Sequence, residues 1–282
     1  MRTATAALRD STNQRRSRRS DGASTPQTAA KPLDRGTPHT EPKAACDEPA
    51  IRGGGGPEKN LFEAPSYLLP RRESGVALTV VLDLDETLVS NRRLDLPAAI
   101  LRPYALKALR ALCETRGVEL VLWTASTEET AAPVVRQLAG GEGGVFHHVI
   151  YRNDAWFTEP YHSKDLRLLG RPMDRVVLFD NAPNCCKMNR HNAVLVDDFS
   201  GYVNPADNTL INLYRIVETL LRHIANGHGV HSVLETLADE SAVCCRVSYD
   251  LPEAWQRIDV SELHPLQVPP HGEFFKVMIT GF

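Results

Sequence analysis

The chain has 282 residues, of which 42% are hydrophobic and 24% are charged, a composition typical of a soluble globular protein. Its formal net charge of −3 provides no overall attraction for nucleic acid or for an anionic membrane. The longest apolar runs are too short to span a bilayer, and the polar N-terminus lacks the apolar core of a signal peptide. The six cysteines match neither a zinc-binding spacing nor a disulfide framework. We therefore expect an intracellular protein with reduced thiols, among which Cys113 belongs to the core.

Residues 1–60 differ in composition from the rest of the chain. They are rich in Ala, Thr, Ser, Pro, Gly and Arg and contain almost no large apolar side chains. Such a segment cannot offset its ordering entropy by burial, so we predict a disordered basic tail. The arginines at 15, 16, 18 and 19 allow a nuclear signal or a mitochondrial presequence, beside a merely solvated tail. A nuclear or cytoplasmic location is favoured, with a mitochondrial one as the alternative.

Four apolar runs in the next part of the chain each end abruptly at a polar residue. Continuous runs of this kind are typical of strands that are buried on both faces. The runs are VALTVVL at 76–82, VELVLW at 118–123, VVLF at 176–179 and AVLV at 193–196, and they end at Asp83, Thr124, Asp180 and Asp197.

Helical patterns separate these predicted strands. Pro103 suits the first position of a helix whose apolar face would carry Leu106, Leu109, Leu112 and Cys113. Ser126 and Glu129 are spaced as a capping box for a second helix, which Pro133 would kink or shift. A third amphipathic stripe runs from Leu210 to Ile224 and ends at Gly227.

Strands that alternate with helices predict an α/β fold, a Rossmann-like and mostly parallel sheet with helices on both faces. We expect this domain to span residues 61–227. Residues 228–282 form an extension of unknown role, in which 232–240 has a helical pattern and 273–280 has a strand pattern.

The segment Asp83-Leu84-Asp85-Glu86-Thr87 carries the strongest chemical signal. In an open parallel sheet the ligand crevice lies outside the carboxyl ends of the strands, where Asp83, Thr124, Asp180 and Asn181 would converge. A carboxylate can attack phosphorus and form an aspartyl phosphate, provided that a hard cation such as Mg²⁺ relieves the repulsion between the anions. A second acid two residues later can protonate the leaving oxygen and then deprotonate water.

Four motifs extend this signal along the chain. DLDETL at 83–88, WTAS at 123–126, HSKDL at 162–166 and FDNAP at 179–183 resemble the FCP/SCP (NLI-interacting-factor-like) phosphatases of the haloacid-dehalogenase superfamily. The resemblance covers about Leu78 to Leu221, and Arg102-Pro103 before the first helix belongs to it. It implies a magnesium-dependent protein serine/threonine phosphatase.

The resemblance implies a role for each matched residue. Asp83 would be the nucleophile and a magnesium ligand. Asp85 would be the general acid and base, with its main-chain carbonyl on the metal. Thr124 would hydrogen-bond a phosphoryl oxygen, and Lys164 would neutralise the charge that develops on the phosphoryl group.

Further positions would complete the metal and substrate sites. Asn181 would bind magnesium directly, with Asp180 beside it sharing or tuning the site. Thr87 and Arg152 would contact the substrate, although an exposed arginine often forms only a surface ion pair. Asp197 and Asp198 are interpreted as acids that close a strand, or as groups outside the direct metal ligands.

The sequence departs from the family pattern between the first motif and the first helix. Only residues 89–101 lie there, where family members usually carry a longer insertion that shapes a peptide pocket. No room is left for a cap domain, so we expect an open site that suits a phosphorylated protein segment better than a free metabolite. A phosphatase for another phosphomonoester remains an alternative. A binding protein on the same scaffold, resembling the mitochondrial import-receptor branch, is the other.

Overall fold

The computed structural model describes residues 66–92, 98–140, 144–157, 163–240, 243–258 and 266–279. The predicted tail at 1–60, Cys46, His162 and the middle of the 89–101 segment therefore lie outside the described residues. Among the helices that are described, none is both long enough and apolar enough to cross a membrane.

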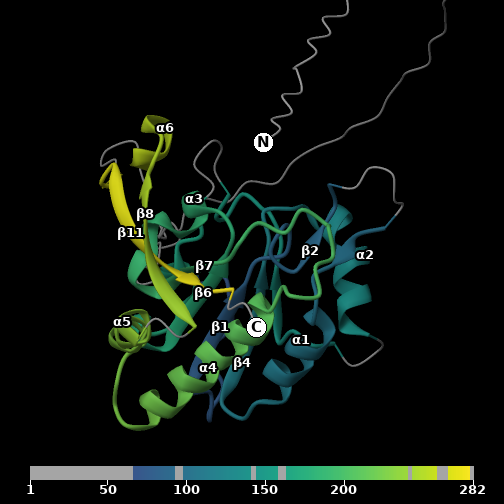
Figure 1. Cartoon of the computed structure of the whole chain (residues 1–282), viewed down its shortest axis with the longest axis horizontal. Coiled ribbons are helices and arrows are strands. Elements are labelled where there is room, and N and C mark those ends of the chain that lie inside the picture. The colour runs from purple at the N-terminus through teal and green to yellow at the C-terminus, as the bar shows by residue number, and fades with distance from the viewer. Residues whose placement is uncertain are drawn as a thin grey trace, which may run out of the picture. The chain divides into compact units, whose positions relative to one another are not determined.

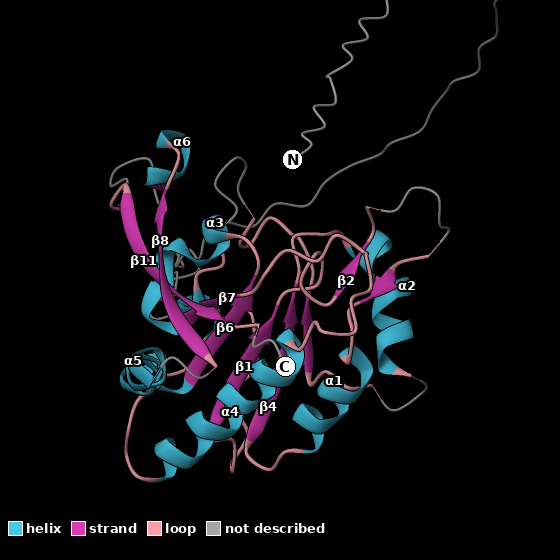
Figure 2. Ribbon diagram, viewed as in Figure 1, coloured by secondary structure: helices cyan, strands magenta, loops and turns pink. Residues whose placement is uncertain are grey.

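The central sheet has seven strands in the order β5-β4-β1-β6-β7-β11-β8 (Figures 1 and 2). All neighbouring strands are parallel except β11 and β8, which are antiparallel. The predicted α/β fold with a mostly parallel sheet is therefore confirmed. The strands are β1 (Leu78–Leu82), β4 (Val118–Trp123), β5 (His148–Ile150), β6 (Val176–Asp180), β7 (Ala193–Leu195), β8 (Cys244–Asp250) and β11 (His271–Val277).

Alternate side chains of β1 enter two different cores, as the period of a strand requires. Leu78, Val80 and Leu82 pack in the core that is shared with the four long helices. Val81 packs on the other face with Trp123 and with the short helical turns there. The long helices are α1 (Ala105–Glu114), α2 (Glu128–Ala139), α4 (Thr209–Ala225) and α5 (Val230–Glu240), and the short ones include η1 (Leu166–Leu169), η2 (Met173–Arg175), α3 (Pro183–Cys186) and η3 (Lys187–Asn192).

Helix α1 begins two residues later than the first position that Pro103 suggested. Ala105, Ala108, Leu109 and Leu112 form its buried face, whereas Leu106 is 44% exposed. The expected position of Leu106 on the apolar face was wrong, because the buried stripe follows the smaller alanines. Cys113 is only partly buried at the edge of this core.

Helix α2 also begins differently from the prediction. Thr127, rather than Ser126, stands at the residue before its first turn, and Pro133 lies inside the helix. The capping box was wrong because the Ser126 hydroxyl is directed to Asp85 instead.

The residues after 227 contribute directly to the main sheet. Strand β11 pairs in parallel with β7, so that Lys276 lies opposite Leu195. Phe275 and Val277 of β11 and five side chains of α5 join the core that contains β1. The remaining elements are small: β2 (Val89–Ser90), β3 (Ile100–Leu101), α6 (Glu253–Gln256), β9 (Arg257–Ile258) and β10 (Leu266–Gln267).

Candidate active site

The carboxyl ends of three neighbouring strands position the predicted catalytic residues. Asp83 follows β1, Thr124 follows β4, and Asp180 is the last residue of β6. The backbone N–H of Asp83 donates to the carbonyl of Phe179 at 3.0 Å, and that of Thr124 donates to Ile150 at 3.0 Å. The ladder of the sheet therefore continues one residue beyond the strands and fixes the backbone of both residues.

Lys164 bridges two of these acids, Asp83 and Asp180. Its ammonium group donates to Asp83 Oδ1 at 2.6 Å and to Asp180 Oδ2 at 2.7 Å. Asp83 is 6% exposed, and Lys164 is fully buried. The second oxygen of Asp180 accepts from the backbone N–H of Ala182 at 2.8 Å, so both of its oxygens have donors.

Burial and charge oppose each other within this triad. Burial raises the pKa of Asp83 to about 7, although the charge of Lys164 pulls it down. Burial alone would lower the pKa of Lys164, but the charges of Asp180 and Asp83 raise it above its ordinary value. Lys164 therefore stays cationic and faces the carboxylate that is expected to attack.

Three donors hold the carboxylate of Asp85. Oδ2 accepts from Thr124 Oγ1 at 3.1 Å and from Ser126 Oγ at 2.8 Å. Oδ1 accepts from Asn91 Nδ2 at 2.9 Å. Thr124 Oγ1 itself accepts from the backbone N–H of Ser126 at 3.0 Å. Asp85 is thereby held beside the end of β4.

A tight turn connects Asp85 to the rest of the loop. Glu86 adopts the left-handed conformation at φ 57°, which is uncommon for a residue with a side chain. Its N–H donates to the carbonyl of Val89 at 2.7 Å, and its carbonyl accepts from Phe199 at 2.8 Å. These bonds compensate for the strain and tie the DLDETL loop to the loop that follows β7.

Asn181 lies between the DLDETL loop and the acids after β7. Thr87 Oγ1 donates to Asn181 Oδ1 at 3.4 Å, and Asn181 Nδ2 donates to Asp198 Oδ1 at 3.0 Å. Asp198 also pairs with Arg92. Asp197 pairs with Lys276 of β11 at 2.5 Å. Both acids after β7 are thus held by cations, and Thr87 is fully buried against Asn181.

Arg102 is buried and connects the loops around the site. It donates to Asp207 Oδ2 at 2.9 Å, to the carbonyl of Thr87 at 3.2 Å and to the carbonyl of Asp197 at 2.8 Å. A fourth bond reaches Thr209 Oγ1 at 3.0 Å. A guanidinium with fixed donor geometry can hold several loops at once, which accounts for an arginine at position 102.

Arg152 lies on the exposed side of the same region. Its backbone N–H donates to the carbonyl of Ser126 at 3.0 Å, which places it next to the segment that holds Asp85. Its guanidinium lies 4.9 Å from the ring centroid of Phe157. A contact between Arg152 and a substrate stays a prediction.

The oxygen donors at this edge fit a magnesium ion. Mg²⁺ binds through one or two carboxylates and completes its shell with waters or other oxygens. Asp83 has one carboxylate oxygen that Lys164 does not occupy, and Asn181, which directly follows β6, has an amide oxygen at the same edge of the sheet. In the part of the chain that is described, no three His, Cys, Asp or Glu side chains gather to hold a metal, so amide, carbonyl and water oxygens would complete the set.

Several residues that shape this site were not expected from the sequence to do so. Ser126, Asn91 and Lys276 are polar residues without a distinctive pattern of their own. Only the position of Ser126, two residues after Thr124 at the end of a strand, offered a usable signal. Lys276 lies 79 residues after Asp197 in sequence, and only the pairing of β11 with β7 brings the two together.

The mostly parallel sheet, with acidic residues at the carboxyl ends of its strands, makes this an α/β protein with a candidate active site at that edge. A model of the NLI interacting factor-like phosphatase family matches residues 78–227, more than half of the chain. The chain therefore belongs to the NLI interacting factor-like phosphatases, within the HAD superfamily.

Individual relatives are distant. The chain is 34% identical over 180 residues to human "Carboxy-terminal domain RNA polymerase II polypeptide A small phosphatase 2", covering 57% of this chain and 64% of that protein. It is 32% identical over 208 residues to human "CTD small phosphatase-like protein", covering 65% and 71%. The chain thus spans slightly less than two thirds of the first of these relatives.

A solved structure of Fcp1, described as an essential RNA polymerase II CTD phosphatase, is also similar. The identity is 16% and the TM-score is 0.35, and the match covers 53% of this chain and 52% of the other.

Proposed function

We propose that the protein is a magnesium-dependent hydrolase of phosphoserine and phosphothreonine in proteins, acting through an aspartyl phosphate on Asp83. The contact of the buried Asp83 carboxylate with the Lys164 ammonium at 2.6 Å carries this proposal. A phosphoryl group that approaches Asp83 meets a cation which is already held in place by Asp180, so little reorganisation is needed during transfer.

The first half of the reaction would be transfer to Asp83. The free carboxylate oxygen of Asp83 bonds to phosphorus while the bond from phosphorus to the serine or threonine oxygen breaks. Asp85 gives its proton to that leaving oxygen. Thr124 and Lys164 donate to the phosphoryl oxygens. Bound magnesium would supply neutralisation of the phosphoryl charge, held by Asp83, the Asp85 carbonyl and Asn181.

The second half would return Asp83 to its starting state. Asp85, now a carboxylate, takes a proton from water as the water oxygen bonds to phosphorus. The bond between phosphorus and Asp83 breaks, and inorganic phosphate leaves. We assign Asp180 to holding Lys164 rather than to direct metal binding, because both of its oxygens already accept hydrogen bonds. Thr87 and Arg152 remain candidates for substrate contacts.

The nucleophile provides the decisive test. Asp83→Asn retains the shape of the side chain but cannot attack phosphorus, so turnover of a phosphoserine peptide should fall by at least about a thousandfold. Asp174→Asn, an exposed aspartate outside the site, serves as the matched control. Trapping with beryllofluoride should occur at Asp83 in the unmodified protein.

Two outcomes would contradict the proposal. Substantial turnover in Asp83→Asn would exclude the covalent route, and full turnover in excess EDTA would exclude the metal. If the unmodified protein hydrolyses an aryl phosphate but no phosphopeptide, the substrate is another phosphomonoester. If it hydrolyses neither in the presence of magnesium, a binding protein on the same scaffold becomes the better description.

A further inference from the structure

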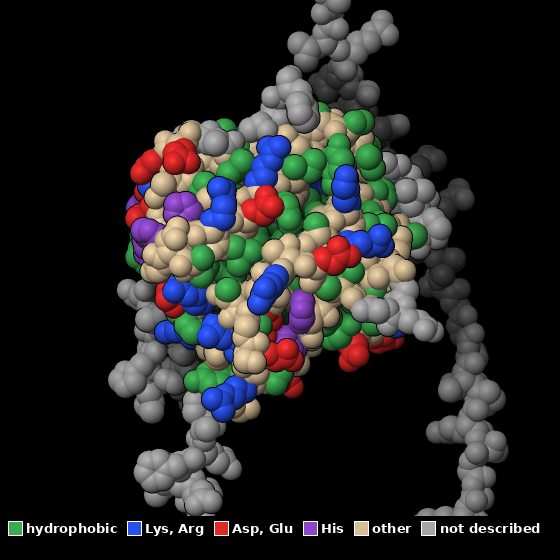
Figure 3. All heavy atoms as spheres, turned by 90° about the horizontal axis from the view of Figure 1, so that it is seen from below, with side chains coloured by type: hydrophobic (Ala, Val, Ile, Leu, Met, Phe, Trp, Pro, Cys, Tyr) green, Lys and Arg blue, Asp and Glu red, His purple; other side chains and the backbone are tan. Residues whose placement is uncertain are grey.

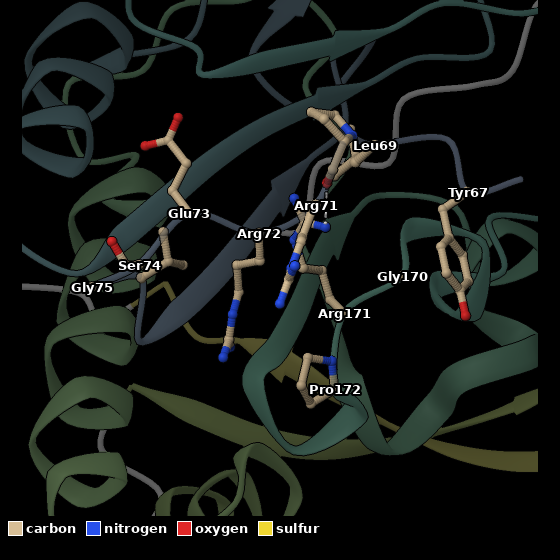
Figure 4. A pocket seen from close by; sticks show the side chains of 12 residues that line it. Tyr67, Leu69, Arg71, Arg72, Glu73, Ser74, Gly75, Gly170, Arg171 and Pro172 are labelled. Carbon is tan, nitrogen blue, oxygen red and sulfur yellow. Dashed lines mark hydrogen bonds between the residues drawn. The ribbon is translucent and has the colours of Figure 1, made fainter. Parts of the chain in front are cut away.

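A pocket of about 770 Å³ lies beside the segment that leads into β1, away from the catalytic residues. Residues 67 and 69–76 line one side of it, and residues 170–172, which follow η1, line the other. Figure 4 shows Arg71, Arg72 and Arg171 gathered in this pocket, with the carboxylate of Glu73 turned away from them. Three of the twelve residues that line it are arginines, against one acidic residue.

The guanidinium of Arg171 is already occupied. It donates to both oxygens of the buried Glu119 at 2.7 and 2.6 Å, and to the carbonyls of Pro70 and Leu169 at 2.9 and 3.2 Å. Four of its five donors thus have partners within the protein. Arg171 is a rigid wall of the pocket, and its charge is neutralised by Glu119.

Arg71 and Arg72 are different. Both are exposed, and neither forms an ion pair or a hydrogen bond with any residue that the structure describes. Two adjacent guanidinium groups repel each other, and an anion placed between them relieves that repulsion. Their planar donors match carboxylate and phosphate oxygens two at a time. Glu73 is the one acidic residue among those that line the pocket.

The segment that carries these arginines is firmly attached to the protein. The N–H of Leu68 donates to the carbonyl of Leu168 at 2.8 Å, Leu69 is buried, and the carbonyl of Pro70 accepts from Arg171. Tyr67 packs directly on Gly170, where a Cβ would lie 2.6 Å from its ring. Because Gly170 also has φ +65°, a side chain there is doubly disfavoured. Arg71 and Arg72 are therefore presented from a fixed backbone.

The pocket and the active site lie at opposite ends of β1. Gly75 and Val76 precede the strand, whereas Asp83 follows it. Five residues at about 3.3 Å each separate the two ends by roughly 17 Å. Figure 3 shows the molecule from the end at which β1 begins, with charged side chains of both signs spread over that face. That face has no general positive field, so an anion would be attracted only by groups of the pocket itself.

We propose that this pocket binds a second, anionic segment of the protein substrate, with Arg71 and Arg72 pairing with its carboxylate or phosphate groups. The inference rests on the proposed function, because it assigns the pocket to the same substrate whose phosphoserine enters the active site. Binding at two points on one chain raises the effective concentration of the phosphoserine at Asp83. Only nine residues connect β2 to β3, and a second contact elsewhere on the protein adds to the recognition of the substrate.

Direct binding tests the pocket without relying on turnover. Two fluorescent probes, a glutamate-rich decapeptide and a phosphoserine decapeptide, are titrated with full-length Asp83→Asn protein and followed by anisotropy. Reversing both charges with Arg71→Glu and Arg72→Glu should weaken binding of at least one probe by about fivefold or more. The control is Arg110→Glu with Arg222→Glu, two exposed arginines on α1 and α4 that undergo the same change of charge.

The outcomes separate cleanly. Weaker binding of the glutamate-rich probe in the Arg71→Glu, Arg72→Glu variant identifies carboxylates as a source of the anion, and weaker binding of the phosphoserine probe alone identifies phosphate. Equal weakening in the pocket and control variants would reduce the effect to net charge and overturn the proposal. If neither probe binds the Asp83→Asn protein that retains Arg71 and Arg72, the proposal is overturned as well, whether or not the protein is a phosphatase.

Turnover then tests whether the pocket acts on the substrate. Two phosphoserine peptides are compared, one of them with a glutamate tract about ten residues from the phosphoserine, because ten extended residues reach about 33 Å. The tract should lower KM by about fivefold in unmodified protein, and this ratio should approach one in the Arg71→Glu, Arg72→Glu variant. Identical KM values for both peptides in unmodified protein would overturn the proposal. Absence of turnover for either peptide would count against the proposed function, and the anisotropy result would still decide the pocket.

Discussion

At the scale of single residues, the carboxylate of Asp85 shows how the site is organised. Three donors from two different segments hold it, two of them on Oδ2 and one on Oδ1. A general acid must present its proton to the leaving oxygen in a narrow range of directions. Thr124 is expected to turn toward the phosphoryl group of a substrate, and Ser126 is then the donor that keeps Asp85 in place.

Ser126→Ala tests this role. Removing the hydroxyl costs Asp85 one hydrogen bond, about 1 kcal/mol, so kcat for an aryl phosphate should fall roughly fivefold to tenfold. KM should change little, because the hydroxyl is not expected to bind the substrate. Ser126→Thr should recover most of the rate. The control is Ser232→Ala on α5, whose hydroxyl donates to the carbonyl of Gly229 at 3.0 Å. An unchanged kcat in Ser126→Ala would refute the role.

At the scale of elements, strand ends were predictable from the sequence and the contacts between distant elements were not. The runs that stop at Asp83, Thr124 and Asp180 predicted three strands and their common edge, because burial on both faces leaves a clear apolar pattern. The four motifs then singled out Lys164, and the structure places it on Asp83. The bonds of Ser126 and Lys276 depend on loop geometry and on sheet order, which leave no local pattern in the sequence.

Lys276 shows how β11 bears on the site. Its ammonium group pairs with Asp197, next to Asp198, which holds the amide of Asn181. In Lys276→Met the apolar stem remains while the charge is lost, so Asp197 is released. Because the pair is partly exposed, we expect the magnesium concentration for half-maximal activity to rise only about twofold to fivefold. Lys276→Arg should restore the value. Calorimetry gives the affinity of each variant for magnesium. Equal affinities of the Lys276→Met and Lys276→Arg variants would contradict this role of Lys276.

A buried ion pair joins β4 to the loop before η2. Burial alone would raise the pKa of Glu119, but hydrogen bonds from Arg171 and Thr79 outweigh it and lower the pKa below its ordinary 4.5. The unfolded chain therefore binds the proton more readily, so the stabilisation is complete above pH 4.5 and is lost as the pH falls through the folded pKa.

Urea unfolding of the Glu119→Gln variant measures how much this ion pair stabilises the protein. It leaves Arg171 buried without its counter-charge, so the free energy of unfolding should fall by about 3–5 kcal/mol at pH 7. The difference from unmodified protein should shrink as the pH falls below 4.5 and through the lowered folded pKa, below which Glu119 is neutral in the folded protein as well. Glu218→Gln, an exposed change on α4, controls for loss of a surface charge. A difference that does not depend on pH would contradict the argument.

At the scale of the whole molecule, the match to the family ends at residue 227 but the fold does not. Helix α5 and strands β8 and β11 supply core side chains that include Val230, Leu234, Cys244, Phe275 and Val277. The expected boundary at 227 followed from the end of an amphipathic helix, which carries no information about where the next segment packs. The described part of 228–282 is an integral part of the sheet.

Truncation after residue 227 follows from this arrangement. The shortened chain keeps every predicted catalytic residue but exposes β7 and the core side of α4. Losing several buried side chains at about 2–3 kcal/mol each exceeds the stability of an ordinary domain. We expect an insoluble or unfolded product, judged by circular dichroism and thermal melting. A cooperative melt close to that of the full chain would show that 228–282 is dispensable.

The position of β11 also has a consequence for how the protein is made. Strand β7 leaves the ribosome roughly 80 residues before β11 does, which at ordinary synthesis rates is a delay of about 4–15 s. Throughout that interval the edge of β7 has no neighbour, and its backbone groups are open to pairing with other chains. A newly made chain with all its catalytic residues synthesised therefore still has an incomplete sheet, and it should associate with chaperones in pulse-labelled cells until β11 is in place.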